Sequence, residues 1–198
     1  MSIRSITIGV AAAAAAVTLL NSRFDISPVY SAPPGKTTTD SSISPTNSSV
    51  HPDRDLPNFA QVAPGIYRGA APTAAGWAKL HAMGIRTEVD LRIEKRGRKE
   101  AEEATRRYGI TRVHIPLGKE APTNKQVQTF LTTLDQAPNQ PIFIHCHYGA
   151  DRTGAMVGIY REVRQGWDFD RTYAEMRHYG FKPFLTELKG AVRQRAPK

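Results

Sequence analysis

The segment from His145 to Gly154, HCHYGADRTG, joins residue types that could break a phosphate ester. Cys146 can act as a nucleophile when its sulfur is ionised, and it follows shortly after the apolar run PIFI. Arg152 stands six residues further on, and its planar guanidinium can bond two phosphoryl oxygens at once. Thr153 could donate its hydroxyl to the sulfur, and His145 could hold the cysteine backbone from behind. The spacing therefore predicts nucleophilic catalysis with an arginine clamp.

A bound phosphate also needs hydrogen-bond donors, and the same segment is expected to supply them. A tight loop at the carboxyl end of a central strand can turn its successive backbone N–H groups inward, and the helix after it adds the positive end of its dipole. Gly149 and Gly154 permit the backbone angles and close approach that such a loop needs. The same positive field favours the thiolate of Cys146. We therefore expect the loop to bind the substrate through His147, Tyr148, Gly149, Ala150, Asp151 and Arg152.

This segment resembles the signature H-C-x5-R-[ST] of the cysteine-dependent tyrosine and dual-specificity phosphatase superfamily, with His145, Cys146, Arg152 and Thr153 at the defining positions. Its extended form is similar to the HCxxGxDRTG variant of bacterial and fungal members. The likeness also covers GIYRGAAPT, TEVDLR, HIPL and YREVRQGWDFDRTYAEMRHYGF, and so spans most of residues 62–185. It is strongest to small exported bacterial members. The resemblance implies a phosphatase that works through a cysteinyl-phosphate intermediate.

The general acid that would protonate the leaving oxygen is the least defined part of the site. The resemblance implies an aspartate on the loop after the strand that precedes the signature strand, but that loop, residues 116–123, contains none. Glu120 is its only carboxylate and is the candidate acid, with a solvated loop glutamate as the alternative. Asp151 is expected to stay ionised beside Arg152 and to orient the hydrolytic water or the loop, or else to form a purely structural ion pair.

Other classes of function account less well for these residues. Adjacent side chains point in different directions, so His145, Cys146 and His147 do not predict a metal site, and the chemistry requires no cofactor. From Leu56 onward, 23 basic residues exceed 14 acidic ones by 9, and such a surface attracts any polyanion. No stacking platform or groove-reading motif indicates a nucleic-acid partner. A phosphate-binding module without turnover stays open because the acid loop lacks aspartate, and the sequence specifies no oligomeric state.

The elements around this segment alternate between strands and helices. We expect strands at 65–68, 86–91, 111–117 and 141–144, and helices at 74–83, 98–108, 124–134, 152–164, 169–179 and 183–192. Thr73 and Thr123 are expected to cap two helices, and Pro183 to open the last one. Trp77 and Trp167 are expected in the core. The pattern predicts an α/β fold with a central, mostly parallel sheet of about four to five strands flanked by helices.

The N-terminal third is expected to address and tether the domain. Residues 1–23 combine Arg4 with an apolar run from Ile6 to Leu20, which suits a signal peptide better than a full membrane span. The candidate cleavage sites near Ala32 are poor, so an uncleaved membrane anchor is a second possibility. A third is an alanine-rich helix without a targeting role. Residues 24–55 are rich in Ser, Thr and Pro and predict a disordered linker before a catalytic domain at 56–198. We expect an exported protein, either periplasmic or anchored to the membrane by this segment.

The sequence as a whole predicts a phosphatase for phosphomonoesters. The resemblance implies phosphotyrosine on proteins as the substrate, with phosphoserine and phosphothreonine as further substrates. Related families with the same loop also take inositol phosphates and phosphoinositides, and the basic surface keeps that alternative open. The partner of this chain is therefore expected to be a phosphorylated protein or another phosphomonoester, and membrane contact is expected only through the N-terminal segment.

Overall fold

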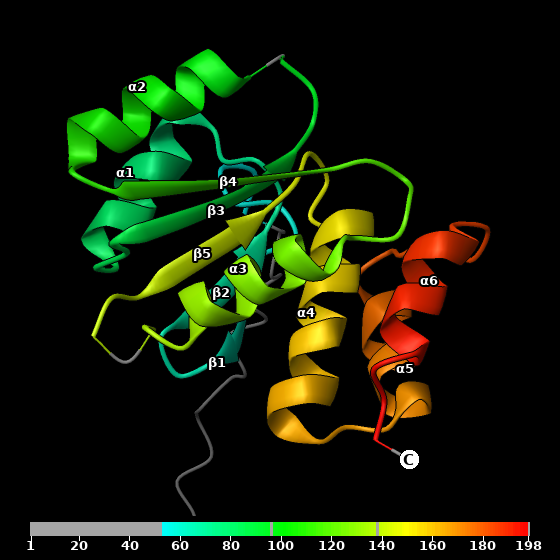
Figure 1. Ribbon diagram of the computed structural model, residues 1–198. Coiled ribbons are helices and arrows are strands. Elements are labelled where there is room, and N and C mark those ends of the chain that lie inside the picture. Colours follow the sequence, from blue (N-terminus) through cyan, green and yellow to red (C-terminus); the bar gives the residue numbers. More distant parts are fainter. Residues whose placement is uncertain (1–52, 96, 138, 198) are drawn as a thin grey trace, which may run out of the picture. The chain divides into compact units, whose positions relative to one another are not determined.

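The computed structural model describes residues 53–95, 97–137 and 139–197, which form five strands and six helices (Figure 1). The strands are β1 (Ala60–Ala63), β2 (Ile66–Gly69), β3 (Thr87–Arg92), β4 (Thr111–Leu117) and β5 (Ile142–His145). The helices are α1 (Ala74–Ala82), α2 (Arg98–Tyr108), α3 (Asn124–Leu134), α4 (Asp151–Gln165), α5 (Phe169–His178) and α6 (Thr186–Arg193). The expected leader at 1–23 and most of the expected linker lie outside the described residues. No helix within the described ranges is long and apolar enough to cross a membrane.

The sheet has the order β1-β2-β5-β3-β4, and only β1 runs antiparallel to its neighbour. β5 lies in the middle and pairs in parallel with both β2 and β3, so that Ile144 stands opposite Arg68 on one side and Val89 on the other. The predicted α/β class and the mostly parallel sheet are confirmed. Because β2, β5, β3 and β4 point the same way, the segments that leave them meet at one edge of the sheet.

The two faces of the sheet are covered by different helices (Figure 1). Successive side chains of a strand point to opposite faces, and β5 follows this rule. Phe143 packs with Trp77 and Leu80 of α1 on one face, which α2 also covers. Ile142 and Ile144 belong to the larger cluster on the other face, which α3, α4, α5 and α6 complete. β5 is buried at all four positions, as its unbroken apolar run predicts.

Short-range signals in the sequence define several helix ends as predicted. The Thr73 hydroxyl accepts a hydrogen bond from the Gly76 N–H at the start of α1. At the start of α3, Thr123 and Gln126 form a reciprocal capping box, which satisfies two N–H groups that the helix itself cannot pair. Gly109 ends α2 in the left-handed conformation that favours glycine. These caps confirm the predicted boundaries to within one or two residues.

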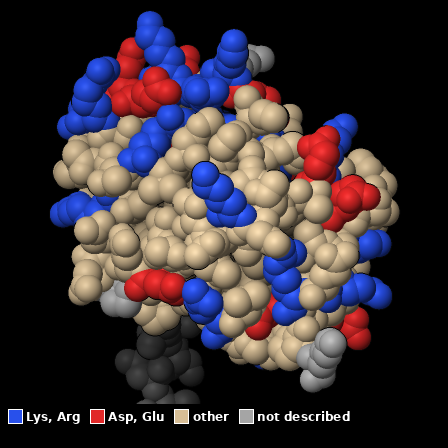
Figure 2. Space-filling view, viewed as in Figure 1, with Lys and Arg blue, Asp and Glu red and all other residues tan. Residues whose placement is uncertain are grey.

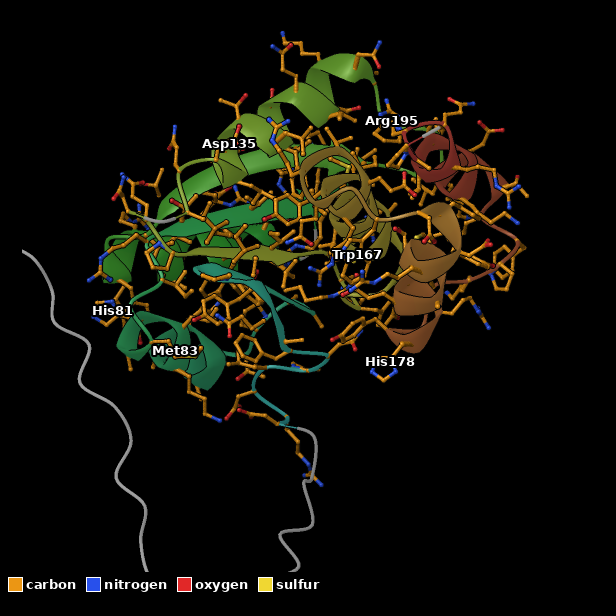
Figure 3. The ribbon with its side chains drawn as sticks, turned by 90° about the horizontal axis from the view of Figure 1, so that it is seen from below. His81, Met83, Asp135, Trp167, His178 and Arg195 are labelled. Carbon is orange, nitrogen blue, oxygen red and sulfur yellow. The ribbon has the colours of Figure 1, made fainter. Side chains whose placement is uncertain are left out.

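Three expectations about the elements are wrong. Pro183 does not open the last helix, because residues 182–185 form a turn in which the Leu185 N–H donates to the Lys182 carbonyl, and α6 begins at Thr186. The edge strand β1 has no counterpart among the predicted strands. Trp167 is not a core residue: it lies half-buried in the turn after α4, between the guanidinium groups of Arg161 and Arg171, at 4.3 and 3.6 Å from its ring centroid (Figure 3).

Glu162 on α4 makes the stability of the fold depend on pH. Neither of its carboxylate oxygens has a hydrogen-bond partner among the described residues. Burial raises the pKa of this carboxyl to about 7, Arg195 opposes the rise and Asp168 adds to it. Because the raised value belongs to the folded state, the native chain holds a proton that the unfolded chain releases between the ordinary glutamate pKa and about 7. The free energy of unfolding therefore falls as the pH rises through this window and levels off above it.

At about pH 5, where the carboxyl of the folded wild type is protonated, we expect Glu162→Gln and the wild type to unfold at similar temperatures. At about pH 8 we expect Glu162→Gln to unfold at a higher temperature than the wild type. Thermal unfolding followed by circular dichroism across this pH range measures the difference. A difference in unfolding temperature that is the same at both pH values would contradict the assignment.

Candidate active site

The segment that follows β5 forms a loop at the carboxyl edge of the sheet and leads directly into α4. We call residues 146–150 the signature loop. Cys146 begins it and is 2% exposed, packed against the core between the sheet and α4. Because β5 is the central strand, the loop is flanked by the segments that leave β2 and β3. The nucleophile predicted from the sequence thus lies at the best-supported point of the fold.

Every backbone carbonyl of the signature loop pairs with a donor from outside the loop. A carbonyl can only accept, so each partner supplies the proton, including the histidine ring nitrogen. The donors, in loop order, are His145 Nδ1 for Cys146 (3.2 Å), the Ala71 N–H for His147 (3.2 Å), Asn58 Nδ2 for Tyr148 (3.2 Å), Arg68 Nη2 for Gly149 (2.8 Å) and the Gly154 N–H for Ala150 (2.8 Å).

These outward carbonyls determine where the amide protons of the loop point. In a trans peptide unit the C=O and the following N–H face opposite ways, so each carbonyl held from outside turns the next N–H toward the inside. The N–H groups of residues 147–150 donate to no described residue. The N-terminus of α4 follows at once and adds its positive end. The arrangement is a cradle of free donors of the kind that binds a phosphate.

Gly149 is required by this geometry, whereas Gly154 is not. Gly149 has φ +67°, and a β-carbon there would lie 2.4 to 2.6 Å from backbone atoms of Gly69 and Ala70. No side chain fits such a contact. Gly154 lies inside α4, and the nearest atom to a β-carbon there would be Phe181 at 3.7 Å, an ordinary contact. The expectation that both glycines serve the loop therefore holds for Gly149 alone.

A buried ionic network supports the loop from beneath the sheet edge. His145 lies behind Cys146 and directs Nε2 to Glu88 at 2.8 Å, with both side chains fully buried. Arg112 pairs with Glu88 at 3.1 Å and with Asp90 at 2.6 Å. Arg92 completes the network by a two-bonded contact with Asp90 at 2.9 Å. Although Glu88, Asp90 and His145 are close enough to hold a metal ion, two guanidinium groups already neutralise the carboxylates, so the set is an ion-pair network.

Arg152 is directed to the mouth of the loop, where it pairs with a residue that the sequence did not predict. Its Nη1 lies 2.7 Å from Glu94, which follows β3, and 3.4 Å from the Leu117 carbonyl at the end of β4. Burial would lower the pKa of Arg152, but the hydrogen bond to Glu94 and the charge of Cys146 raise it overall. The guanidinium is thus ionised and holds a carboxylate that a bound phosphate would have to replace.

Asp151 does not pair with Arg152, unlike what its position in the sequence suggests. It is the first residue of α4, and its carboxylate accepts a hydrogen bond from the Lys182 N–H at 2.9 Å, with the Lys182 ammonium 3.7 Å away. The contact joins the helix start to the turn before α6. This geometry favours the structural alternative for Asp151.

The side chains of Glu120 and Thr153 would have to move to play the roles expected of them, which are proton donation to the leaving group and a hydrogen bond to the sulfur. Glu120 is exposed, and its carboxylate folds back over Gly118, into the space that a β-carbon of Gly118 would occupy. The Thr153 hydroxyl is fully buried and has no hydrogen-bond partner within the described ranges. Among the described hydrogen bonds, none joins either side chain to the Cys146 sulfur.

A cavity of about 480 Å³ opens beside the signature loop, between α1 and α2. Its apolar lining includes Pro72, Trp77, Ala101, Ala104 and Tyr108. The cavity meets the signature loop at His147 and Arg92. Its charged lining also includes the acidic Glu100 and Glu103 and the basic Arg107. Figure 2 shows basic and acidic side chains intermixed over the region of α2.

Asn58 and Arg68 are loop contacts that the sequence analysis missed. Arg68 belongs to the segment GIYRGAAPT, which carries part of the family resemblance but no chemistry of its own. Asn58 precedes β1, a strand that was not expected. Neither residue is near the loop in sequence, since 90 positions separate Asn58 from Tyr148 and 81 separate Arg68 from Gly149.

The fold and the loop define a protein of the cysteine-dependent dual-specificity phosphatase class. The sequence model of one family, described as "DSP-PTPase phosphatase fused to NAD+ Kinase", matches residues 48–194, and the chain belongs to this family.

Similar proteins agree with this class. The chain is 31% identical over 125 residues to the dual specificity protein phosphatase TpbA of Pseudomonas aeruginosa, a match that covers 63% of this chain and 55% of TpbA. It is 34% identical over 131 residues to inositol diphosphatase DSP2 of Oryza sativa subsp. japonica, with 62% and 61% covered. The chain thus spans little more than half the length of these relatives.

Two solved structures show the same fold. A crystal structure of a variant of P. aeruginosa TpbA in complex with pTyr superimposes with a TM-score of 0.59 at 27% identity, over 69% of this chain and 83% of the other. The core catalytic domain of the PP-IP phosphatase SIW14 from S. cerevisiae superimposes with a TM-score of 0.64 at 24% identity, over 74% and 88%.

Proposed function

We propose that this chain hydrolyses phosphomonoesters through a cysteinyl-phosphate intermediate. The observation that carries the proposal is the set of inward N–H groups of residues 147–150, which surround the space above Cys146. Donors fixed in this way stabilise the charge that spreads over the phosphoryl oxygens in the transition state. The family and its relatives support the same chemistry.

The reaction proceeds in two displacements. The Cys146 thiolate attacks phosphorus, the bond from phosphorus to the leaving oxygen breaks, and that oxygen takes up a proton. Water then attacks the cysteinyl phosphate, the S–P bond breaks, and the sulfur leaves as thiolate while inorganic phosphate is released. Arg152 exchanges Glu94 for two phosphoryl oxygens during both steps, and Glu120 swings from Gly118 to donate the proton.

The cavity beside the loop favours phosphotyrosine over an inositol phosphate as the substrate. An aromatic leaving group gains from apolar walls such as those of Trp77, Ala104 and Tyr108. A highly phosphorylated inositol needs several free cations, but Arg92 is already paired with Asp90, and two glutamates line the same cavity. Inositol diphosphates, on which relatives such as DSP2 are named to act, are the second candidate.

A substrate panel tests this preference. We expect a phosphotyrosine peptide to show a higher kcat/KM than an inositol diphosphate. Ala104→Trp fills the cavity and should lower kcat/KM for the peptide about tenfold, the effect of losing one well-fitted apolar contact, while acetyl phosphate is turned over as before. Ala78→Trp adds the same bulk on the exposed side of α1 and is the matched control. Faster turnover of the inositol diphosphate, unaffected by Ala104→Trp, would support the second candidate, and no turnover of any ester would overturn the function.

We propose further that residues 1–23 export the domain, as a cleaved signal or as an anchor that holds it at the membrane. The apolar run after Arg4 supports this role. Cell fractionation of the full chain and of a chain that lacks residues 1–23 tests it, and an identical distribution of the two would overturn it.

A further inference from the structure

We propose that Arg68 and Asn58 are positioning residues that set the anion-binding geometry of the signature loop through the carbonyls of Gly149 and Tyr148. The inference deepens the proposed function, because it concerns how the same loop acquires its phosphate affinity. Neither residue belongs to the signature, and both reach the loop from the segment around β1 and β2.

Arg68 is a buried cation whose single described hydrogen bond goes to the signature loop. Its side chain is 1% exposed, Nη2 donates to the Gly149 carbonyl at 2.8 Å, and Nε and Nη1 have no partner among the described residues. Burial lowers the pKa of Arg68 to about 10, against the opposing charges of Glu175, Tyr179 and Cys146, so the guanidinium stays charged at neutral pH. A buried charge with so few partners costs stability, which indicates that its place at the loop serves another purpose.

The consequence for the loop follows from the peptide unit between Gly149 and Ala150. Arg68 holds the Gly149 carbonyl on the outer side of the loop, and the Ala150 N–H must then point inward. The bond is charge-assisted, and such bonds are about twice as strong as neutral ones. If the carbonyl were released, this peptide unit could rotate and place an oxygen, rather than an N–H, against the phosphate.

Asn58 acts in the same way on the preceding peptide unit. Its Nδ2 donates to the Tyr148 carbonyl at 3.2 Å, which turns the Gly149 N–H inward, and to the Tyr179 carbonyl at 3.0 Å. Asn58 is also the only non-glycine residue of the described ranges with positive φ, at 56°. Asparagine tolerates this conformation better than most non-glycine residues, so the backbone at this position suits the side chain that donates to the loop.

Tyr179 joins the two residues into one brace. Its ring lies against the Arg68 guanidinium, 3.9 Å from the carbon to the ring centroid, and its carbonyl accepts the second bond of Asn58. The end of α5 therefore fixes both donors in place. Both hydrogen bonds from the brace to the signature loop end on backbone carbonyls, so we expect the brace to set phosphate binding through the loop backbone.

The test measures binding of inorganic phosphate to the full chain without requiring turnover. Cys146 is the only cysteine, so its alkylation by iodoacetamide, read as a mass change, reports one site, and bound phosphate protects it. We expect Arg68→Met to raise the phosphate concentration for half-protection roughly 10- to 100-fold, the range for one hydrogen bond to a charged group. Arg68→Lys should recover part of this loss. Asn58→Gly keeps the left-handed backbone, removes only the amide, and should raise the same concentration about 3- to 10-fold.

Arg164→Met is the control for the loss of an arginine outside the brace. Arg164 pairs with Asp135 through two hydrogen bonds, away from the signature loop, so the variant should keep the phosphate affinity of the wild type. Folded Arg68→Met with unchanged phosphate protection overturns the proposal. If Arg68→Met does not fold, unchanged protection in Asn58→Gly overturns it equally. A wild type that binds phosphate but hydrolyses no ester would overturn the proposed function and would not affect the proposal for Arg68 and Asn58.

Discussion

Cys146→Ser is expected to abolish turnover of phosphomonoesters while the protein still binds them. A serine hydroxyl is protonated at neutral pH and attacks phosphorus far more slowly than a thiolate, so kcat should fall by roughly 10⁴-fold or more. The N–H groups of residues 147–150 do not depend on the sulfur, because outside donors hold the loop carbonyls. Isothermal titration with inorganic phosphate should therefore give the variant an affinity close to that of the wild type, and a phosphotyrosine peptide should bind to the variant without being hydrolysed. Steady-state assays on the same preparation measure the loss of turnover.

Two further variants separate the roles around this cysteine. Arg152→Ala should lower kcat by about 10²- to 10³-fold, because it removes a preorganised donor to the transition state.

Glu120→Gln should lower kcat for substrates with poor leaving groups, because these leaving groups need a proton. It should leave kcat almost unchanged for a substrate with a good leaving group, such as p-nitrophenyl phosphate. Residual turnover in Cys146→Ser at the wild-type level would contradict the mechanism. If Glu120→Gln turns over every substrate at the wild-type rate, Glu120 is not the general acid. The assignment of Cys146 as the nucleophile would be unaffected.

Gly149→Ala is expected to destroy the anion site without unfolding the domain. The new methyl group would lie within 2.6 Å of backbone atoms of Gly69 and Ala70, and neither backbone segment can yield without moving β2 or the loop. The signature loop is the part free to move, and its displacement breaks the bond from Arg68 and misaligns the amide donors. We expect kcat/KM to fall at least about 100-fold, as misplaced donors in a preorganised site cost this much. Phosphate protection of Cys146 should be lost in parallel.

Gly166→Ala provides a control with the same backbone strain. Gly166 ends α4 at φ +67°, the angle of Gly149, but a β-carbon there meets nothing within 4 Å. Both variants carry the left-handed strain of about 1 kcal/mol, so both should lower the unfolding temperature slightly. Only Gly149→Ala should lose phosphate binding. A similar loss of activity in the two variants would attribute the effect to backbone strain and not to the collision.

The order of elements and the motif were readable from sequence because their signals are local. A capping threonine meets an N–H only three residues away, as Thr73 and Thr123 show. An unbroken apolar run predicts a buried strand, and the run before His145 became the central strand β5. Thr186, not Pro183, starts the last helix, because a turn around Lys182 also satisfies the local backbone. Trp167 was misplaced because its partners are two arginine side chains and not an apolar face.

What the sequence determined by itself is the chemistry of the loop: a cysteine, an arginine six positions later, and glycines that can adopt backbone angles closed to other residues. The tertiary structure decided which groups surround that loop. Asn58 and Arg68 meet it across 90 and 81 residues, and Glu94 reaches Arg152 across 58. Such contacts exist only after β2, β5 and β3 pair side by side, and no periodicity or neighbour preference within a few residues encodes that pairing.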